Sequence, residues 1–115
     1  MLFRSEPLDL AGAIAKLEAA HAVIIVDCLT LWLTNLLLQD EPAMAGRIAA
    51  FLEIVDQSPS TVIAVTNEVG CGIVPENALA RRFRDLQGRL NQDSARVAHE
   101  VYWMVFGYPM KVKQS

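Results

Sequence analysis

Three short apolar runs, all rich in β-branched residues, predict buried strands. They cover residues 22–26, 61–65 and 101–106. Each run is continuous rather than alternating with polar residues, which is typical of strands that are covered on both faces. We therefore expect all three strands to lie in the interior of a sheet.

Apolar residues at helical spacing lie between these runs. They predict helices over residues 10–20, 44–55 and 76–98. Helices that alternate with buried strands are typical of an α/β protein with a mostly parallel sheet and flanking helices. In the tail at residues 110–113 lysines alternate with apolar residues, which suits a short strand at a sheet edge. No repeat or linker interrupts the pattern, so we expect one domain.

Residues 29–38 form a further helical segment that is apolar almost all round. Such a helix is expected to be buried on every side. The covering surface is either the rest of this fold or another subunit, and the sequence leaves both interpretations open.

Composition narrows the function classes. The chain has 115 residues, of which 53% are hydrophobic and 20% charged, so a packed core is expected and wholesale disorder is not. A net charge of −3 argues against a protein that follows nucleic-acid phosphates. The apolar run at 29–38 is too short to span a bilayer. Cys28 and Cys71 have no metal-ligand or disulfide-framework spacing. We expect a cytoplasmic protein.

Asp27 is the first candidate site residue because it directly follows the strand expected at 22–26. Ligands of parallel α/β sheets gather at the carboxyl ends of the strands. An acidic residue in this place holds Mg²⁺, directly or through water, in many nucleotide-binding proteins. The alternative is that Asp27 caps the helix that follows it.

Thr66, Asn67 and Glu68 follow the second predicted strand in the same way. Gly70 and Gly72 come next, and glycines permit a close approach of the backbone to a ligand. These three polar residues are therefore candidates for contact with a ligand. An ordinary surface loop is the alternative, and the loop residues by themselves favour it.

The long helix expected at 76–98 is rich in arginine. One interpretation is a solvated stripe in which Arg82, Arg89 and Arg96 pair with Asp85 and Asp93. The other is a cluster of guanidiniums that binds phosphates or carboxylates. Under that second interpretation the candidate substrate contacts are Arg81, Arg84 and Arg89.

Four segments together resemble one enzyme family. They are Val-Thr-Asn-Glu-Val-Gly-Cys-Gly-Ile-Val-Pro-Glu-Asn at 65–77, the arginine-rich residues 79–92, Asp-Cys-Leu-Thr at 27–30 with Thr-Asn-Leu-Leu at 34–37, and Gly-Tyr-Pro-Met-Lys-Val-Lys at 107–113. From Glu6 onward the chain resembles the C-terminal part of the bifunctional adenosylcobinamide kinase / adenosylcobinamide-phosphate guanylyltransferase of cobalamin biosynthesis.

The resemblance implies a P-loop nucleotide-binding fold that assembles as a homotrimer. It implies phosphorylation of adenosylcobinamide with GTP or ATP, then transfer of GMP from GTP to adenosylcobinamide phosphate through a guanylylated histidine. Asp27 falls where the family has an acidic residue at the nucleotide and its Mg²⁺ ion. Thr66, Asn67 and Glu68 fall near the phosphates.

The sequence also departs from the family pattern. No glycine precedes a Lys-Ser or Lys-Thr pair, so the phosphate-binding loop is absent. His21 precedes the first strand and cannot replace the guanylylated histidine. We therefore expect residues 6–115 to be the C-terminal part of one P-loop domain, incomplete at its N-terminus, inactive alone and preceded by a non-native leader at 1–5. The alternative is a non-catalytic nucleotide- or corrinoid-binding module derived from that fold.

Overall fold

The computed structural model describes residues 6–18, 23–70, 72 and 75–114. The leader expected at 1–5 lies outside these ranges.

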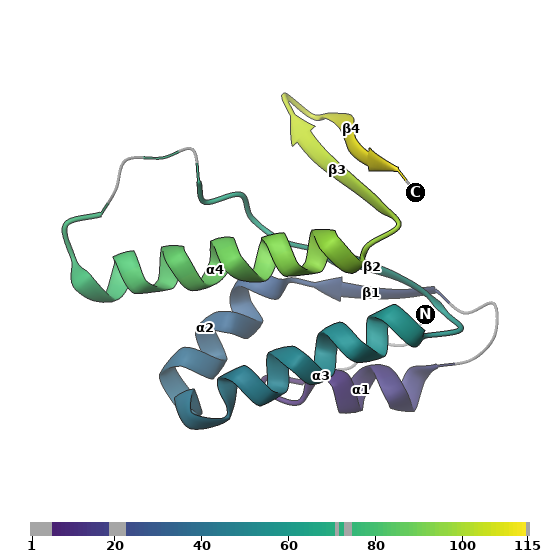
Figure 1. Cartoon of the computed structure of the whole chain (residues 1–115), viewed down its shortest axis with the longest axis horizontal. Helices are drawn as coiled ribbons and strands as arrows, with labels where there is room; N and C mark the ends of the chain where they lie inside the picture. The colour runs from purple at the N-terminus through teal and green to yellow at the C-terminus, as the bar shows by residue number, and fades with distance from the viewer. Residues whose placement is uncertain (1–5, 19–22, 71, 73–74, 115) are drawn as a thin grey trace.

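The described elements follow the order expected from the sequence (Figure 1). His21 and Cys71 lie outside the described residues. The elements are α1 Leu10–Leu17, β1 Val23–Asp27, α2 Leu29–Gln39, a 3₁₀ turn Glu41–Ala43, α3 Met44–Gln57, β2 Thr61–Val65, α4 Ala78–Val97, β3 Glu100–Val105 and β4 Tyr108–Gln114.

Side-chain caps define the start of two helices. Asp9 accepts a hydrogen bond from the amide of Gly12 at 3.0 Å and begins α1. Asn77 accepts from the amides of Leu79 and Ala80 at 2.8 and 3.1 Å and begins α4. Both residues satisfy amides that have no partner inside the helix, which is why these residue types end the preceding loop.

Strands β1 and β2 are parallel, with Val23 opposite Thr61 and Asp27 opposite Val65. Helices α2 and α3 form the connection between them. The expected mixed α/β architecture with a parallel pair of strands is confirmed. The register brings the carboxyl ends of both strands to the same edge, where Asp27 stands beside the start of the loop after β2.

The core lies between the helices and one face of the sheet. The rings of Trp32 and Phe51 meet with centroids 5.3 Å apart. The indole nitrogen of Trp32 donates to the carbonyl oxygen of Leu8 at 2.8 Å, so this buried polar atom is satisfied. The buried cluster draws on α1 to α4 and β1, and consists of Ile14, Ile24, Val26, Leu29, Trp32, Leu33, Leu36, Met44, Phe51 and Leu90.

The prediction that the strands are covered on both faces is wrong for β1 and β2. Ile24 and Val26 are buried, but Val23 and Ile25 on the opposite face are 62% and 65% exposed. On β2, Ile63 and Val65 are also exposed. We call this surface the open sheet face. A continuous apolar pattern shows that both faces of a strand are apolar, but it does not show what packs against each face. In the described part of the chain, helices pack against only one face.

The prediction that the third strand joins the parallel sheet is also wrong. β3 pairs with β4 in an antiparallel hairpin that forms a separate sheet and projects from the body (Figure 1). Phe106 and Gly107 form its turn with φ of 51° and 79°. A two-residue turn with positive φ at both positions suits the right-handed twist of the flanking strands. The chain therefore reverses direction within two residues. The predicted tail strand is confirmed as β4, paired with β3.

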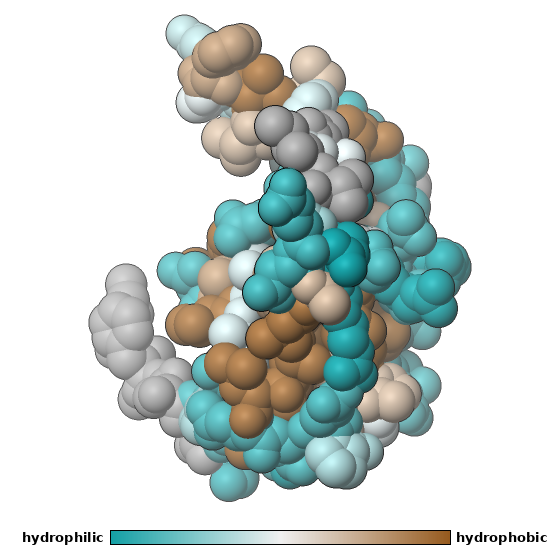
Figure 2. Space-filling view, turned by 90° about the vertical axis from the view of Figure 1, so that its left-hand side faces the viewer, coloured by the Kyte–Doolittle hydropathy of each residue, from teal (hydrophilic) through white to brown (hydrophobic). Residues whose placement is uncertain are grey.

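Helix α2 is buried on one side only. Leu33 and Leu36 are fully buried, whereas Leu31 is 59% and Leu38 67% exposed. Figure 2 shows apolar side chains gathered on the end of the molecule where α2 lies. The expected burial on every side is therefore not supplied by the described part of this chain. Over those same residues, every helix is too short or too polar to cross a lipid bilayer.

Candidate functional site

Asp27 ends β1 at the edge where both parallel strands terminate. It is exposed, and its side chain makes no hydrogen bond or ion pair with any other described residue. Helix α2 has Cys28 as its N-cap and no side-chain cap hydrogen bond. The alternative that Asp27 caps this helix is therefore wrong for this structure. Its carboxylate is free to contact a ligand.

This carboxylate suits a magnesium ion held together with a nucleotide. Mg²⁺ in phosphate-transfer sites binds through one or two carboxylates, water and the substrate phosphates. Among the described residues no group of three or more His, Cys, Asp or Glu side chains could form a complete metal cage. Asp27 fits a site in which the nucleotide itself supplies further oxygen ligands.

A network of five residues anchors the loop after β2, and we call it the strand-end network. It links Thr66 on the loop to Gln87 and Asn91 on α4. The Thr66 hydroxyl donates to Asn91 Oδ1 at 2.7 Å, and Gln87 Nε2 donates to Thr66 Oγ1 at 3.0 Å and to Asn91 Oδ1 at 2.8 Å. The remaining members are Thr30 and Asn67.

Asn67 is held by its backbone and leaves its side chain free. Its amide donates to Thr30 Oγ1 at 3.2 Å, and its carbonyl accepts from Asn91 Nδ2 at 2.8 Å. The Asn67 side chain makes no hydrogen bond to another described residue, so it can meet a ligand. Glu68, by contrast, accepts from the amide of Gly70 at 2.5 Å and turns its carboxylate onto its own loop.

Gln87 belongs to the strand-end network and was not among the candidates expected from the sequence. It is fully buried and lies four residues after Phe83 and three before Leu90, within the apolar stripe of α4. The sequence does carry a signal for Gln87, which is a polar residue at a position on the apolar face of the helix. A carboxamide buried there needs hydrogen-bond partners. Gln87 Nε2 finds them in Thr66 and Asn91, while its Oε1 has no partner among the described atoms.

The arginines of α4 fall into two groups. Arg82 forms an ion pair with Glu41, and Arg96 pairs with Asp93 at 2.7 Å. The solvated-stripe interpretation is thus correct for Arg96. Arg82, however, pairs with Glu41 in the 3₁₀ turn before α3 and not with Asp85. The Arg89 side chain has no ion pair or hydrogen bond to any described residue.

Arg81 and Arg84, the other two candidate substrate contacts, bind backbone carbonyls instead of carboxylates. Arg84 Nε donates to the Val69 oxygen at 3.1 Å, and Arg81 donates to the oxygens of Pro75 and Glu76. Each keeps its positive charge uncompensated by an ion pair among the described residues.

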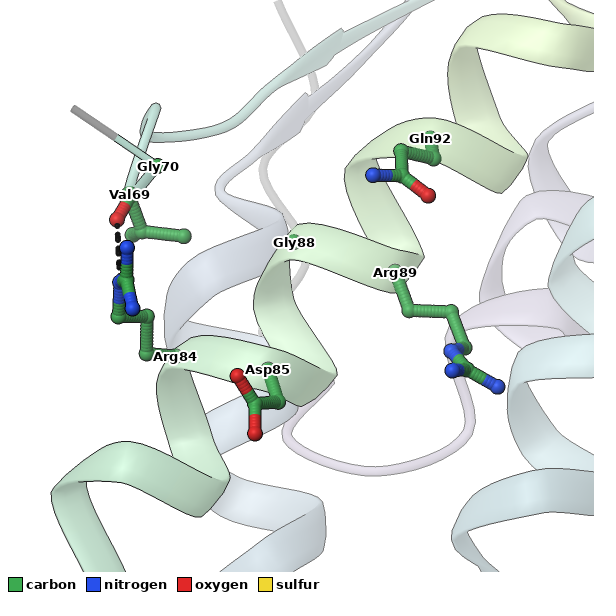
Figure 3. A pocket seen from close by; sticks show the side chains of 7 residues that line it. All are labelled: Val69, Gly70, Arg84, Asp85, Gly88, Arg89 and Gln92. Atoms are coloured by element: carbon green, nitrogen blue, oxygen red, sulfur yellow. Dashed lines mark hydrogen bonds between the residues drawn. The ribbon is translucent and has the colours of Figure 1, made fainter.

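A groove of about 380 Å³ lies between α4 and the loop after β2. We call it the α4 groove. Two of the three candidate arginines, Arg84 and Arg89, line it with side chains that extend to opposite sides of α4, and Arg81 is not part of the lining (Figure 3). Its lining consists of Val69, Gly70, Arg84, Asp85, Gly88, Arg89 and Gln92 (Figure 3).

Known proteins resemble most of the chain. Residues 3–112 match the family described as cobinamide kinase / cobinamide phosphate guanyltransferase. The bifunctional adenosylcobalamin biosynthesis protein CobP of Pseudomonas aeruginosa is 44% identical over 109 residues, which cover 94% of this chain and 63% of that protein. The bifunctional adenosylcobalamin biosynthesis protein CobU of Escherichia coli is 39% identical over 107 residues. The match covers 81% of this chain and 59% of the Escherichia coli protein.

A third relative extends this pattern. The bifunctional adenosylcobalamin biosynthesis protein CobU of Salmonella typhimurium is 40% identical over 109 residues and is covered over 60% of its length. The chain thus spans about three fifths of these curated relatives. With a family match across nearly all of its residues, the chain belongs to the cobinamide kinase / cobinamide phosphate guanyltransferase family.

Proposed function

We propose that this chain carries the strand-end half of a nucleotide site that serves cobinamide phosphorylation and GMP transfer. The full reaction phosphorylates adenosylcobinamide and then transfers GMP from GTP to the phosphate in cobalamin biosynthesis. Family membership supports the reaction class. The single observation that carries the site is Asp27, a free carboxylate at the meeting point of two parallel strand ends.

Each residue of the proposed site has a distinct task. Asp27 would hold Mg²⁺, directly or through water, and a magnesium ion bound there would neutralise charge on the nucleotide phosphates. The Asn67 carboxamide would hydrogen-bond the nucleotide. Thr66 acts indirectly, since its hydroxyl is already bonded to Asn91 and Gln87 and holds the loop in place.

Glu68 would reach a ligand only by leaving the amide of Gly70. We assign it to the nucleotide site as a residue that exchanges this local hydrogen bond for one to the ligand. In the same proposal, residues 6–115 form the C-terminal part of a P-loop domain, and three copies of the complete domain assemble into a homotrimer.

Nucleotide binding by the Asp27→Asn variant tests the site. The substitution removes the negative charge and nearly preserves the side-chain volume. We expect Mg²⁺-dependent binding of a fluorescent GTP analogue to weaken at least about tenfold, because a charge-assisted contact is lost, while the thermal midpoint stays unchanged. Asp56→Asn is the matched control, since Asp56 is exposed on α3, away from the strand ends. Equal affinity of Asp27→Asn and the unmodified chain would refute the assignment.

A non-catalytic nucleotide- or corrinoid-binding module is the second candidate. The observation in its favour is that no glycine in this sequence precedes a Lys-Ser or Lys-Thr pair. Without such a loop the electrostatic stabilisation of a transferring phosphoryl group is largely missing. We expect the chain, incubated with labelled GTP and cobinamide, to give neither labelled protein nor product. GTP binding without turnover would support the module, and covalent GMP labelling would place the nucleophile in this chain.

A further inference from the structure

Gln87 is a polar residue within the apolar stripe of α4. It is fully buried, as is Leu90 three residues later, and its Oε1 has no partner among the described atoms. A buried carboxamide oxygen without a partner lowers stability, whereas a methionine of similar length would leave no such oxygen there. A position where a sequence departs from its own pattern in this way is a candidate for a role in function.

The hydrogen bonds of the strand-end network run in one direction, which the Asn67 carbonyl sets. A carbonyl oxygen only accepts, so Asn91 turns Nδ2 toward it at 2.8 Å. Asn91 Oδ1 therefore faces Thr66 and Gln87, and because this oxygen also only accepts, both residues must present donors to it. The Thr66 hydroxyl lies 2.7 Å from Asn91 Oδ1, and Gln87 Nε2 lies 2.8 Å from it. The Gln87 carboxamide is thus held with Nε2 toward the loop.

Two helices fix the position of Asn67. Its amide donates to Thr30 Oγ1 on α2 at 3.2 Å, and its carbonyl accepts from Asn91 on α4. If the Asn91 carboxamide turned over, the Asn67 carbonyl would face an oxygen instead of a donor. Gln87 opposes that turn, because its Nε2 donates to the oxygen side of the Asn91 carboxamide.

We infer that Gln87 is a positioning residue for the Asn67 side chain. Its Nε2 holds Asn91 in the orientation that fixes the Asn67 carbonyl, and it also donates to Thr66, the preceding residue of the loop. Because Gln87 is fully buried, it acts through Asn91 and Thr66 and does not touch a ligand itself. The inference rests on the proposed function only for the identity of the ligand that Asn67 contacts, which is the nucleotide.

An isosteric change from donor to acceptor tests the direction of the network. Gln87→Glu keeps the shape of the side chain, but an ionised carboxylate can only accept. Asn91 would then turn Nδ2 toward position 87, and the Asn67 carbonyl would lose its donor. At about pH 8 we expect affinity for a Mg²⁺-bound fluorescent GTP analogue to weaken at least about fivefold relative to the unmodified chain. At about pH 5 the protonated carboxyl can donate in place of Nε2, so most of that relative affinity should return.

A second variant separates positioning from folding. Gln87→Met nearly preserves the volume and removes both the donor and the unpartnered oxygen, so the thermal midpoint should hold or rise. We expect its affinity for the GTP analogue to weaken at least about threefold at both pH values, because acid cannot restore a donor. Gln57→Glu is the matched control, since Gln57 is exposed at the end of α3. This control should bind like the unmodified chain at both pH values.

Amide hydrogen exchange measures the loop without any nucleotide. In both Gln87 variants we expect residues 66–68 to exchange at least about fivefold faster at about pH 8, relative to intrinsic rates, while β1 and β2 keep their protection. In Gln87→Glu the protection of the loop should return at about pH 5, and in Gln87→Met it should not. Mass spectrometry of peptides that cover the loop and the two strands gives both rates.

Three outcomes overturn the inference. Unchanged exchange of residues 66–68 in both variants would show that Gln87 does not position the loop. Faster exchange throughout the chain, with a lowered thermal midpoint in both variants, would assign Gln87 to folding alone. Faster loop exchange with unaltered affinity for the GTP analogue would show that the position of Asn67 does not serve nucleotide binding. Failure of the magnesium site is measured separately, by the Asp27→Asn variant, and leaves the exchange result standing.

Discussion

The two faces of the parallel strand pair are similar in composition and opposite in environment. Ile24 and Val26 are 7% exposed and lie in the core, whereas Val23 and Ile25 alternate with them and are more than half exposed. Apart from Asp27 and Thr61 on the open sheet face, both faces carry apolar residues, so apolar character does not distinguish them. Burial depends on which elements pack against a strand, and in the described chain all four helices contribute to the core on one side.

The open sheet face adjoins the proposed nucleotide site. Asp27 follows Ile25 by two positions, so both side chains lie on that face. Exposed contiguous apolar surface in a soluble protein marks a place where another element or protein binds. The comparison therefore predicts that substitutions on the two faces differ in kind: those on the covered face change stability, and those on the open face change association.

The largest expected effect comes from the core. Phe51→Ala should lower the free energy of unfolding by about 3–5 kcal/mol, because it leaves a cavity beside Trp32. Ile25→Ala on the open sheet face should change it by less than about 0.5 kcal/mol. Urea denaturation of both variants measures the difference. Equal destabilisation would show that the open face is covered in solution.

The second prediction concerns association. The double variant Ile25→Thr/Ile63→Thr should reduce hydrophobic-dye binding by roughly half and lower self-association, because it removes apolar surface that the described chain leaves uncovered. Threonine retains strand propensity, so the thermal midpoint should hold. Dye fluorescence and analytical ultracentrifugation report the two properties. Thr61→Ser on β2 is the control, and a dye-silent, monomeric unmodified chain would contradict the prediction.

The third prediction concerns the strand-end network. Asn91→Ala removes the acceptor of Gln87 Nε2 and the donor to the Asn67 carbonyl. We expect a loss of about 1–3 kcal/mol in the free energy of unfolding, because the buried Gln87 loses a partner. The neighbouring exposed residue Gln92, changed to alanine, should cost almost nothing. A comparable loss in both variants would mean that the network does not stabilise the loop.

The smallest effect is expected in the β3–β4 hairpin. Lys111 Nζ donates to Glu100 Oε1 at 2.8 Å, and this hydrogen bond lowers the pKa of the Glu100 carboxyl and raises the pKa of Lys111. The stability that ionised Glu100 contributes to the hairpin is present above the pKa of Glu100 in the unfolded chain. It is lost as the pH falls through the lower pKa of the folded chain. The stability that protonated Lys111 contributes is lost as the pH rises through the raised pKa of Lys111 in the folded chain.

Amide hydrogen exchange in the hairpin should therefore become faster, relative to the intrinsic rate, at acidic pH. Because both side chains are well exposed, the change should be slight. Glu100→Gln should remove the acidic part of this dependence. An unaltered pH profile in that variant would show that the ion pair does not contribute.

The candidate site was predictable in part. Asp27 was predictable as a candidate from its place after an apolar run, because a strand end in a parallel sheet is where ligands gather, and its contact with a ligand stays a prediction. The different roles of Thr66 and Asn67 were not predictable, since they depend on where Asn91 of α4 lies. The sorting of the arginines depended likewise on Glu41, which is remote in sequence and adjacent to Arg82 in space.

The sequence by itself determined the elements of this protein. Strand β2 was predicted with its observed bounds, and the predicted start of the helix at residue 44 matches α3. Such patterns depend on residues within one or two helical turns of each other. They can therefore be recognised in a single sequence. The family resemblance was likewise carried by local motifs, and the family match supports it.

Only the tertiary structure decided how those elements share their surfaces. It left one face of β1 open, paired β3 with β4 instead of with the parallel strands, and placed Gln87 beside Thr66. The first and third outcomes depend on packing between residues far apart in the chain, whereas the hairpin follows from the turn at Phe106 and Gly107. Apolar character makes burial favourable, but the packing partner alone determines whether a given side chain is buried.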